Sequence, residues 1–146
     1  MADDNQKPLA QKLGIDQGMT VSILNAPNYF HFDLGDLPDD VDVRRDADNK
    51  PADLFLIFSS RSAEAERGFH RAMTLLPADG AIWVAWPKKS SGQQTDINED
   101  TLREVFLPKG MVDNKVCSID ETWSAVRFVV REEDRDDWPS QLEATD

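Results

Sequence analysis

The chain has 146 residues, the size of one ordinary domain, which buries roughly two thirds of its unfolded surface without disulfides or metal ions. Its 28 acidic and 16 basic side chains give a formal net charge of −12, which would repel a phosphate backbone, so we expect no nucleic-acid partner. The single Cys117 excludes an internal disulfide, and with only two histidines beside it a cysteine–histidine zinc site has no support.

The first third of the chain predicts short elements. After a polar start at 1–7, which we expect to be frayed, residues 8–14 predict a short amphipathic helix between a proline and a glycine. The partly alternating MTVSIL at 19–24 predicts a first strand. Aromatic and leucine side chains at 29–37 are spaced for a helix that faces a sheet. Valines flanked by acids and arginines at 41–45 are typical of an edge strand.

Two uninterrupted apolar runs dominate the middle of the chain. They are LFLIF at 54–58 and AIWVAWP at 81–87, and no polar residue alternates with the apolar ones in either run. This pattern predicts central strands of a parallel sheet, which are covered on both faces. Between them, residues 63–76 place apolar side chains on one face of a helix, and Ser62 is a weak start signal for it.

The last part of the chain predicts a loop, a helix and a hairpin. The polar segment at 90–100, SSGQQTDINED, resembles a mobile cover more than a core element. Asn98 is placed to cap a helix at 99–107, which ends at a proline and a glycine. Residues 112–119 and 123–131 predict an antiparallel hairpin at a sheet edge, because side chains that face opposite sides alternate cleanly in the second segment.

The order of these elements predicts an α/β protein with a Rossmann-like, doubly wound, mostly parallel sheet and a C-terminal antiparallel hairpin. We assign one domain to residues 1–131. The charge run at 132–146 predicts a disordered acidic tail, with docking of Trp138 on the body as the less favoured alternative. The apolar runs are shorter than the roughly 18 residues of a membrane span, and the start MADDNQK is no signal peptide, so we expect a cytoplasmic protein without a membrane partner.

Two resemblances follow from these residues. Part of the chain resembles the second half of the fold of S-adenosylmethionine-dependent methyltransferases. This part consists of LFLIF, a helix, LLPADGAIWVAWP, a further helix and a terminal hairpin. Over about residues 9–131, the chain resembles a bacterial family of short Rossmann-like proteins of unknown function. The motifs that carry this resemblance are KLGIDQGMTVSILNAP, WPKKSSG, TDINED and VDNKVCSIDETWSAVRFV. That resemblance implies a small Rossmann-like protein and transfers no catalytic residue.

The methyltransferase pattern fails at the cofactor turns. A glycine-rich first turn and an acid after the second strand hold the cofactor in Rossmann folds. Here the first turn reads Asn25, Ala26, Pro27, without a glycine, and Arg44 and Arg45 follow the second strand before any acid. We therefore expect no cofactor, and S-adenosylmethionine binding remains an alternative.

If the sheet is right, the turns after the first, third and fourth strands and the hairpin turn share one edge, where ligands of open α/β sheets bind. The candidate ligand-binding residues at this edge are Asn25, Ala26, Pro27, Arg61, Trp86, Lys88, Lys89, Ser90, Asp120, Glu121 and Trp123.

Several of these residues also have a structural interpretation, which the sequence favours. Lys88 and Lys89 could bind a phosphate or carboxylate, but pairing with Asp120 and Glu121 to clamp the loop is the preferred interpretation. Tryptophans more often fill a core or its rim than stack on a ligand. Cys117 fits an inert buried thiol, and His31 and His70 fit structural roles, so we assign no catalytic residue and no metal site.

Three hypotheses for the function remain. The leading one is a non-catalytic Rossmann-like binding module that holds a small anionic ligand or a partner segment at the edge carrying WPKK and DETW. The second is a divergent S-adenosylmethionine-dependent methyltransferase, so the sequence leaves open whether the chain is an enzyme. The third is an interaction subunit that contacts a protein partner through tryptophans and its acidic tail.

Overall fold

The computed structural model describes residues 8–28, 30, 36–45 and 50–138. The strands of its sheet are β1 (Thr20–Leu24), β2 (Asp42–Arg45), β3 (Leu54–Phe58), β4 (Ala81–Pro87), β5 (Met111–Ser118) and β6 (Trp123–Val130). The α-helices in the described ranges are α1 (Leu9–Leu13), α3 (Ser62–Leu75) and α4 (Glu99–Phe106), and the short 3₁₀ helices are η2 (Lys89–Ser91), η3 (Leu107–Lys109) and η4 (Glu132–Asp137). None of the helices in these ranges has the length and apolar character of a membrane span.

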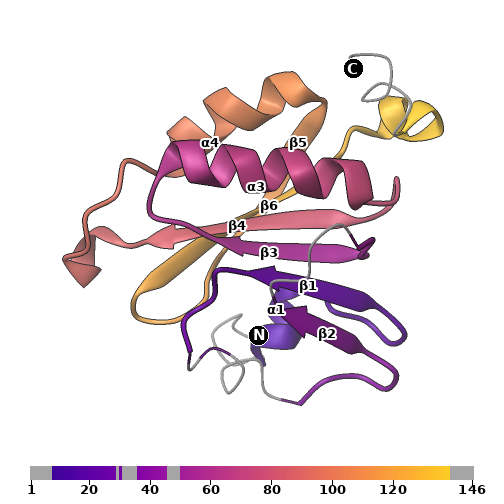
Figure 1. The fold of residues 1–146 in the computed structure, drawn as a ribbon, viewed down its shortest axis with the longest axis horizontal. Helices are drawn as coiled ribbons and strands as arrows, with labels where there is room; N and C mark the ends of the chain where they lie inside the picture. Colours follow the sequence, from indigo (N-terminus) through magenta and orange to yellow (C-terminus); the bar gives the residue numbers. More distant parts are fainter. Residues whose placement is uncertain (1–7, 29, 31–35, 46–49, 139–146) are drawn as a thin grey trace, which may run out of the picture.

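The strands form one sheet in the order β2-β1-β3-β4-β6-β5. The first four strands in this order are parallel, and β6 runs antiparallel to both β4 and β5. From β1 the chain moves outward to β2 and then returns to the other side of β1 to form β3, so a topological switch point lies between β1 and β3 (Figure 1). The architecture confirms the predicted Rossmann-like sheet with a terminal antiparallel hairpin.

The two apolar runs form the centre of this sheet. Every residue of β3 and of β4 is buried, as expected for parallel strands that are covered on both faces. In contrast, β2 lies at the edge, and each of its residues is at least partly exposed. The uninterrupted apolar runs therefore predicted the central strands correctly, and the valines flanked by charged residues predicted the edge strand β2 correctly.

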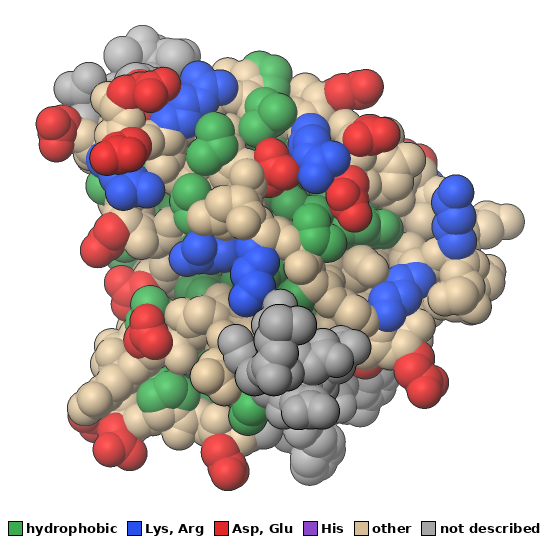
Figure 2. Space-filling model, turned by 180° about the vertical axis from the view of Figure 1, so that it is seen from behind, with side chains coloured by type: hydrophobic (Ala, Val, Ile, Leu, Met, Phe, Trp, Pro, Cys, Tyr) green, Lys and Arg blue, Asp and Glu red, His purple; other side chains and the backbone are tan. Residues whose placement is uncertain are grey.

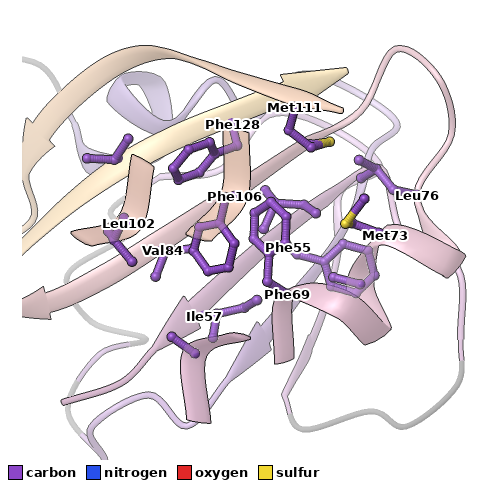
Figure 3. Close-up of a cluster of buried hydrophobic side chains, with 14 of the residues drawn as sticks. Phe55, Ile57, Phe69, Met73, Leu76, Val84, Leu102, Phe106, Met111 and Phe128 are labelled. Carbon is purple, nitrogen blue, oxygen red and sulfur yellow. The ribbon is translucent and has the colours of Figure 1, made fainter. Parts of the chain in front are cut away.

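Helices α3 and α4 cover one face of the sheet (Figure 1). Beneath them, the rings of Phe69 on α3 and Phe106 on α4 stack with centroids 3.8 Å apart and an interplanar angle of 11°. Phe128 of β6 meets both rings edge-on, at 5.4 and 5.3 Å (Figure 3). This three-ring contact joins both helices to the sheet, because each ring comes from a different element.

Helix α1 packs on the opposite face, which Figure 2 shows from outside. Trp83 of β4 is completely buried there, and its Nε1 donates a hydrogen bond of 2.9 Å to the carbonyl oxygen of Leu13. Lys115 of β5 reaches the same helix, where its Nζ donates to the carbonyl oxygen of Lys12 at 3.1 Å. Both contacts satisfy carbonyls at the end of α1, which would otherwise lack intrahelical donors.

The helix starts agree with the sequence only in part. Asn98 caps α4 as predicted: its side chain accepts from the Thr101 amide, and the Thr101 hydroxyl accepts from the Asn98 amide, both at 2.9 Å. Helix α3 begins at Ser62 but has no side-chain cap from its own N-cap residue. Of the helix predicted at 29–37, residues 29 and 31–35 lie outside the described residues, as do residues 1–7.

Trp138 corrects the prediction for the start of the acidic tail. Residues Glu132–Asp137 form η4, and the Trp138 side chain that follows is 9% exposed within the core under α3 and α4. Its Nε1 donates a hydrogen bond of 2.8 Å to the carbonyl oxygen of Leu76. The favoured expectation of a solvated tryptophan is therefore wrong, because the indole finds both an apolar site and an acceptor. Residues 139–146 lie outside the described residues.

Candidate ligand-binding site

The strand order places the predicted site residues along one edge of the sheet, which we call the carboxyl edge. Strands β1, β3 and β4 end there, and β6 begins there with Trp123 paired to Pro87. The turns after β1, β3 and β4 and the turn between β5 and β6 therefore meet at this edge. Their side-chain contacts divide them into three groups rather than one continuous site.

The first group closes the turn after β1. Asn25 adopts a left-handed backbone conformation with φ of 60°, and its side-chain nitrogen donates to Glu64 on α3 at 3.2 Å. From the end of β2, a guanidinium nitrogen of Arg45 donates to the carbonyl oxygens of Ala26 and Pro27, at 3.3 and 3.1 Å. An arginine of this chain thus spans the ends of β1 and β2, where Rossmann folds place cofactor-binding groups.

The second group is a clamp between the end of β4 and the hairpin turn. The Lys88 ammonium group donates to the hydroxyl oxygen of Ser118 at 2.6 Å and to the carbonyl oxygen of Asp120 at 2.7 Å. The Lys88 amide donates to the carbonyl oxygen of Thr122 at 2.7 Å. The preferred interpretation of a clamp is correct for Lys88 but not for the exposed Lys89, and the acceptors are a hydroxyl and a carbonyl oxygen rather than the predicted carboxylates.

In the hairpin turn, the Asp120 carboxylate binds backbone amides of the turn itself. A carboxylate oxygen of Asp120 accepts from the amides of Thr122 and Trp123, each at 2.8 Å, which is the contact of an Asx turn. Glu121 is exposed. Trp123 is half-buried and meets Phe58 edge-on at 5.0 Å. In this group, Glu121 alone presents a carboxylate to solvent without a turn contact.

Substituting Lys88 tests the clamp. We expect Lys88→Met to lower the free energy of unfolding by about 1–2 kcal/mol, because it removes two hydrogen bonds from a partly buried charged donor. The neighbouring Lys89 is exposed, so Lys89→Met should change stability by less than about 0.5 kcal/mol. Urea unfolding followed by circular dichroism compares the two variants, and equal losses would contradict a specific clamp.

The third group surrounds the turn after β3. Buried Ser59 closes this turn, since its hydroxyl accepts from the Arg61 amide at 3.1 Å and donates to the Arg61 carbonyl oxygen at 2.9 Å. Thr95 crosses over the turn, and its hydroxyl donates to the Ser60 carbonyl oxygen at 2.8 Å. A carboxylate oxygen of Asp96 accepts from the Ser62 amide at 2.6 Å and so caps α3.

A polar hollow of about 300 Å³ lies within this third group, and we call it the Arg61 hollow. Its lining residues come from the turn after β3 and the segment before α4: Ser60, Arg61, Gln94, Thr95 and Asp96. The Arg61 side chain is exposed and forms no hydrogen bond or ion pair with any described residue. Among the described residues, none accepts from its guanidinium donors, which border the hollow.

The remaining predicted residues lie outside this hollow. Trp86 is 8% exposed and points into the core under α3 and α4, which confirms the preference for core filling. Lys89 and Ser90 are exposed on η2. The segment predicted as a mobile cover is attached to the body by Thr95 and Asp96, and its Ile97 is 4% exposed in the core. The prediction that this segment is not a core element is therefore wrong at Ile97.

Sequence reasoning missed four contributors to the edge. Arg45 closes the first turn, and Gln94, Thr95 and Asp96 line the Arg61 hollow. The signal for Arg45 was present, because an arginine replaces the acid expected after the second strand. The signal for Asp96 was a helix start at Ser62 without a strong cap of its own, which required a cap from elsewhere in the chain.

The titratable groups with shifted pKa values lie away from the carboxyl edge. Burial lowers the pKa of Arg127, which faces Trp83 in the middle of the sheet, while Asp16 acts in the opposite direction. The hydrogen bond of 2.9 Å that Arg103 donates to the Asp113 carboxylate raises the pKa of Arg103. Within the described ranges, no group of three or more His, Cys, Asp or Glu side chains is arranged to bind a metal ion.

The strand order and the C-terminal antiparallel hairpin give a methyltransferase-like Rossmann fold. No protein-family model matches the sequence, and no curated protein matches it either, so the resemblance to a family of unknown function stays a prediction. Solved structures do match. A SAM-dependent methyltransferase from Aquifex aeolicus aligns with a TM-score of 0.53 and 14% identity over 88% of this chain and 90% of its own.

Two further solved structures show the same fold. The fibrillarin pre-rRNA processing protein of Methanococcus jannaschii aligns with a TM-score of 0.59 and 11% identity, over 80% of this chain and 68% of its own. The magnesium protoporphyrin IX methyltransferase of Synechocystis, solved with bound SAH, aligns with a TM-score of 0.54 and 10% identity, over 84% and 78%. At these identities the likeness shows a shared fold.

Proposed function

We propose that this chain is a cytoplasmic, methyltransferase-like binding module that holds a small anionic ligand in the Arg61 hollow and transfers no methyl group. The observation that carries the proposal is the exposed Arg61 guanidinium beside a polar hollow of about 300 Å³ at the carboxyl edge. A guanidinium presents a planar set of donors that matches a carboxylate or phosphate. The hollow has the volume of the smallest ligand sites in proteins.

The remaining lining favours a ligand that carries both charge and hydrogen-bonding groups. Gln94 adds an exposed amide, and the hydroxyl of Thr95 already donates to the Ser60 carbonyl oxygen. The Asp96 carboxylate accepts from the Ser62 amide, which offsets part of its charge beside the entering anion. A carboxylate or phosphate on Arg61, with an adjacent hydroxyl or amide, fits this arrangement.

The first turn supports binding without methyl transfer. Arg45 donates to the carbonyl oxygens of Ala26 and Pro27, so a side chain of the protein joins the ends of β1 and β2. The turn also lacks the glycines that allow a backbone to approach a nucleotide cofactor. A cofactor bound there in the usual way would have to displace Arg45.

Thermal melting with a ligand panel tests the proposal. The panel contains inorganic phosphate, pyrophosphate, nucleotides, nicotinamide dinucleotides, S-adenosylmethionine and S-adenosylhomocysteine. A ligand at a hundredfold its Kd stabilises by about 2.7 kcal/mol, which for this size raises the Tm by about 5–10 °C. We expect a phosphate-bearing compound to give such a shift, and Arg61→Ala to abolish it with little change in the Tm without ligand. Lys50→Ala, which removes an exposed charge elsewhere, is the matched control.

A divergent methyltransferase is the second candidate, and the solved methyltransferases with the same fold favour it. In that case the two methionine cofactors alone would shift the Tm, and the shift would survive Arg61→Ala but change with Arg45→Ala. That result would overturn the proposal. No shift with any compound would also contradict it and would direct the search to protein partners.

A further inference from the structure

The Arg61 hollow is lined by one full charge of each sign. Arg61 lies in the turn after β3 and Asp96 in the segment before α4, and both side chains are exposed. The other lining residues, Ser60, Gln94 and Thr95, are uncharged. A carboxylate beside the cation weakens the binding of a purely anionic ligand, because like charges repel. The lining therefore favours a ligand that carries a positive group in addition to its anionic group.

The two charges of the hollow are not paired with each other. Among the described residues, none accepts from the Arg61 guanidinium, and Asp96 accepts through one carboxylate oxygen only, from the Ser62 amide at 2.6 Å. The second carboxylate oxygen of Asp96 has no partner in the described part of the chain. A ligand with two opposite charges can pair with both groups at once, whereas an ion of either sign pairs with one and is repelled by the other.

Contacts within the protein hold the carboxylate in place. The Thr95 hydroxyl donates to the Ser60 carbonyl oxygen at 2.8 Å, and the Asp96 amide donates to the same oxygen at 3.4 Å. The Thr95 hydroxyl also accepts from the amide of Ile97 at 3.1 Å, and Ile97 is buried in the core. The segment that carries Asp96 is thus anchored at both the core and the turn after β3. Its carboxylate is positioned before a ligand binds, which lowers the entropy cost of binding.

We infer that the ligand of the Arg61 hollow is a phosphate monoester that also carries a primary ammonium group, such as 2-aminoethyl phosphate. The phosphate pairs with the guanidinium of Arg61, and the ammonium group donates to the second carboxylate oxygen of Asp96. A phosphate monoester carries nearly two negative charges at pH 7, so the ligand stays anionic after the ammonium group is added. The inference rests on the proposed function, because it specifies the ligand class of the same site.

The experiment is a titration of the isotope-labelled full chain with two matched phosphates, followed by amide resonances. One is 2-aminoethyl phosphate, and the other is 2-hydroxyethyl phosphate, which has a hydroxyl group in place of the ammonium group. We expect both to shift amides of residues 60–62 and 94–96. The ammonium compound should bind about two- to fivefold more tightly, the range of one exposed ion pair. Added salt should reduce this ratio, since both charged side chains are exposed.

Asp96→Asn isolates the charge of the carboxylate. Asparagine is as good a cap as aspartate, so the variant keeps an acceptor for the Ser62 amide and should fold. We expect 2-aminoethyl phosphate to bind this variant more weakly and 2-hydroxyethyl phosphate more tightly, which brings the ratio of the two Kd values to about one. The matched control is Asp79→Asn, which removes an exposed carboxylate in the turn before β4, outside the hollow. It should leave the ratio unchanged.

The possible results separate this inference from the proposed function. If both phosphates bind equally and Arg61→Ala weakens both, the proposed function stands and the ammonium inference is overturned. If neither phosphate binds, or if Arg61→Ala leaves their binding unchanged, both are overturned. An equal change of the ratio in Asp96→Asn and Asp79→Asn would also overturn the inference. Phosphatidylcholine vesicles with added phosphatidylethanolamine carry the same two groups on a lipid. Sedimentation of the chain with these vesicles, without binding of free 2-aminoethyl phosphate, would overturn the monoester in favour of a lipid headgroup.

Discussion

Replacing Trp83 by alanine should lower the free energy of unfolding by about 4–5 kcal/mol, the largest loss that we expect from one substitution. Trp83 is completely buried at the centre of β4 and packs in the core beneath α1. Its indole nitrogen also binds the Leu13 carbonyl oxygen at 2.9 Å. Alanine leaves a cavity and an unpaired buried acceptor, and both effects weaken the attachment of α1 to the sheet.

Trp83→Phe separates the two effects. Phenylalanine retains most of the ring contact but has no donor, so we expect an intermediate loss of about 2 kcal/mol. Urea unfolding by circular dichroism provides the free energies, with Gln11→Ala on the exposed side of α1 as a control expected within about 0.5 kcal/mol. If Trp83→Ala costs less than about 2 kcal/mol, the core beneath α1 contributes far less to stability than its burial indicates.

The central strands could be predicted because their signal is local. β3 and β4 are uninterrupted apolar runs, and a run of this kind has no exposed face whatever surrounds it. The cap of α4 is equally local, since Asn98 and Thr101 are three residues apart. Once strands and helices are placed in order, right-handed crossovers leave few topologies, so the carboxyl edge followed from the sequence.

The candidate site could be predicted only as an edge. Which side chains there face solvent depends on contacts between distant residues: Asp96 caps a helix that begins 34 residues earlier, and Arg45 reaches the Pro27 carbonyl oxygen 18 residues away. Lys88 and Asp120 resemble ligand-binding residues in sequence, yet both are engaged in the hairpin turn. Type and spacing of residues locate polar groups, whereas their availability is set by tertiary contacts.

The expectation of a solvated Trp138 failed for a different physical reason. Residues 132–137 are all charged, and charge runs with few apolar residues predict disorder because they bury too little surface to offset chain entropy. One tryptophan changes this balance. Trp138 fills a site in the core, and a local average of charge does not register a single large side chain at the end of the run.

Replacing Trp138 by alanine should therefore lower the free energy of unfolding by about 3 kcal/mol. The variant loses the contacts of a side chain that is 9% exposed and the hydrogen bond to the Leu76 carbonyl oxygen at 2.8 Å. That carbonyl follows α3 directly, so the same substitution should loosen the end of this helix. We expect hydrogen exchange to accelerate in η4 and at the end of α3, and to change little in β3.

Two comparisons make the Trp138 result decisive. Trp138→Phe retains a ring without the donor and should lose about half as much stability as Trp138→Ala. Glu133→Ala removes an exposed charge from η4 and should change stability by less than about 0.5 kcal/mol. An unchanged urea midpoint in Trp138→Ala would mean that the indole contact contributes nothing to folding. A loss near 3 kcal/mol would show that the folded domain continues beyond residue 131 to at least residue 138.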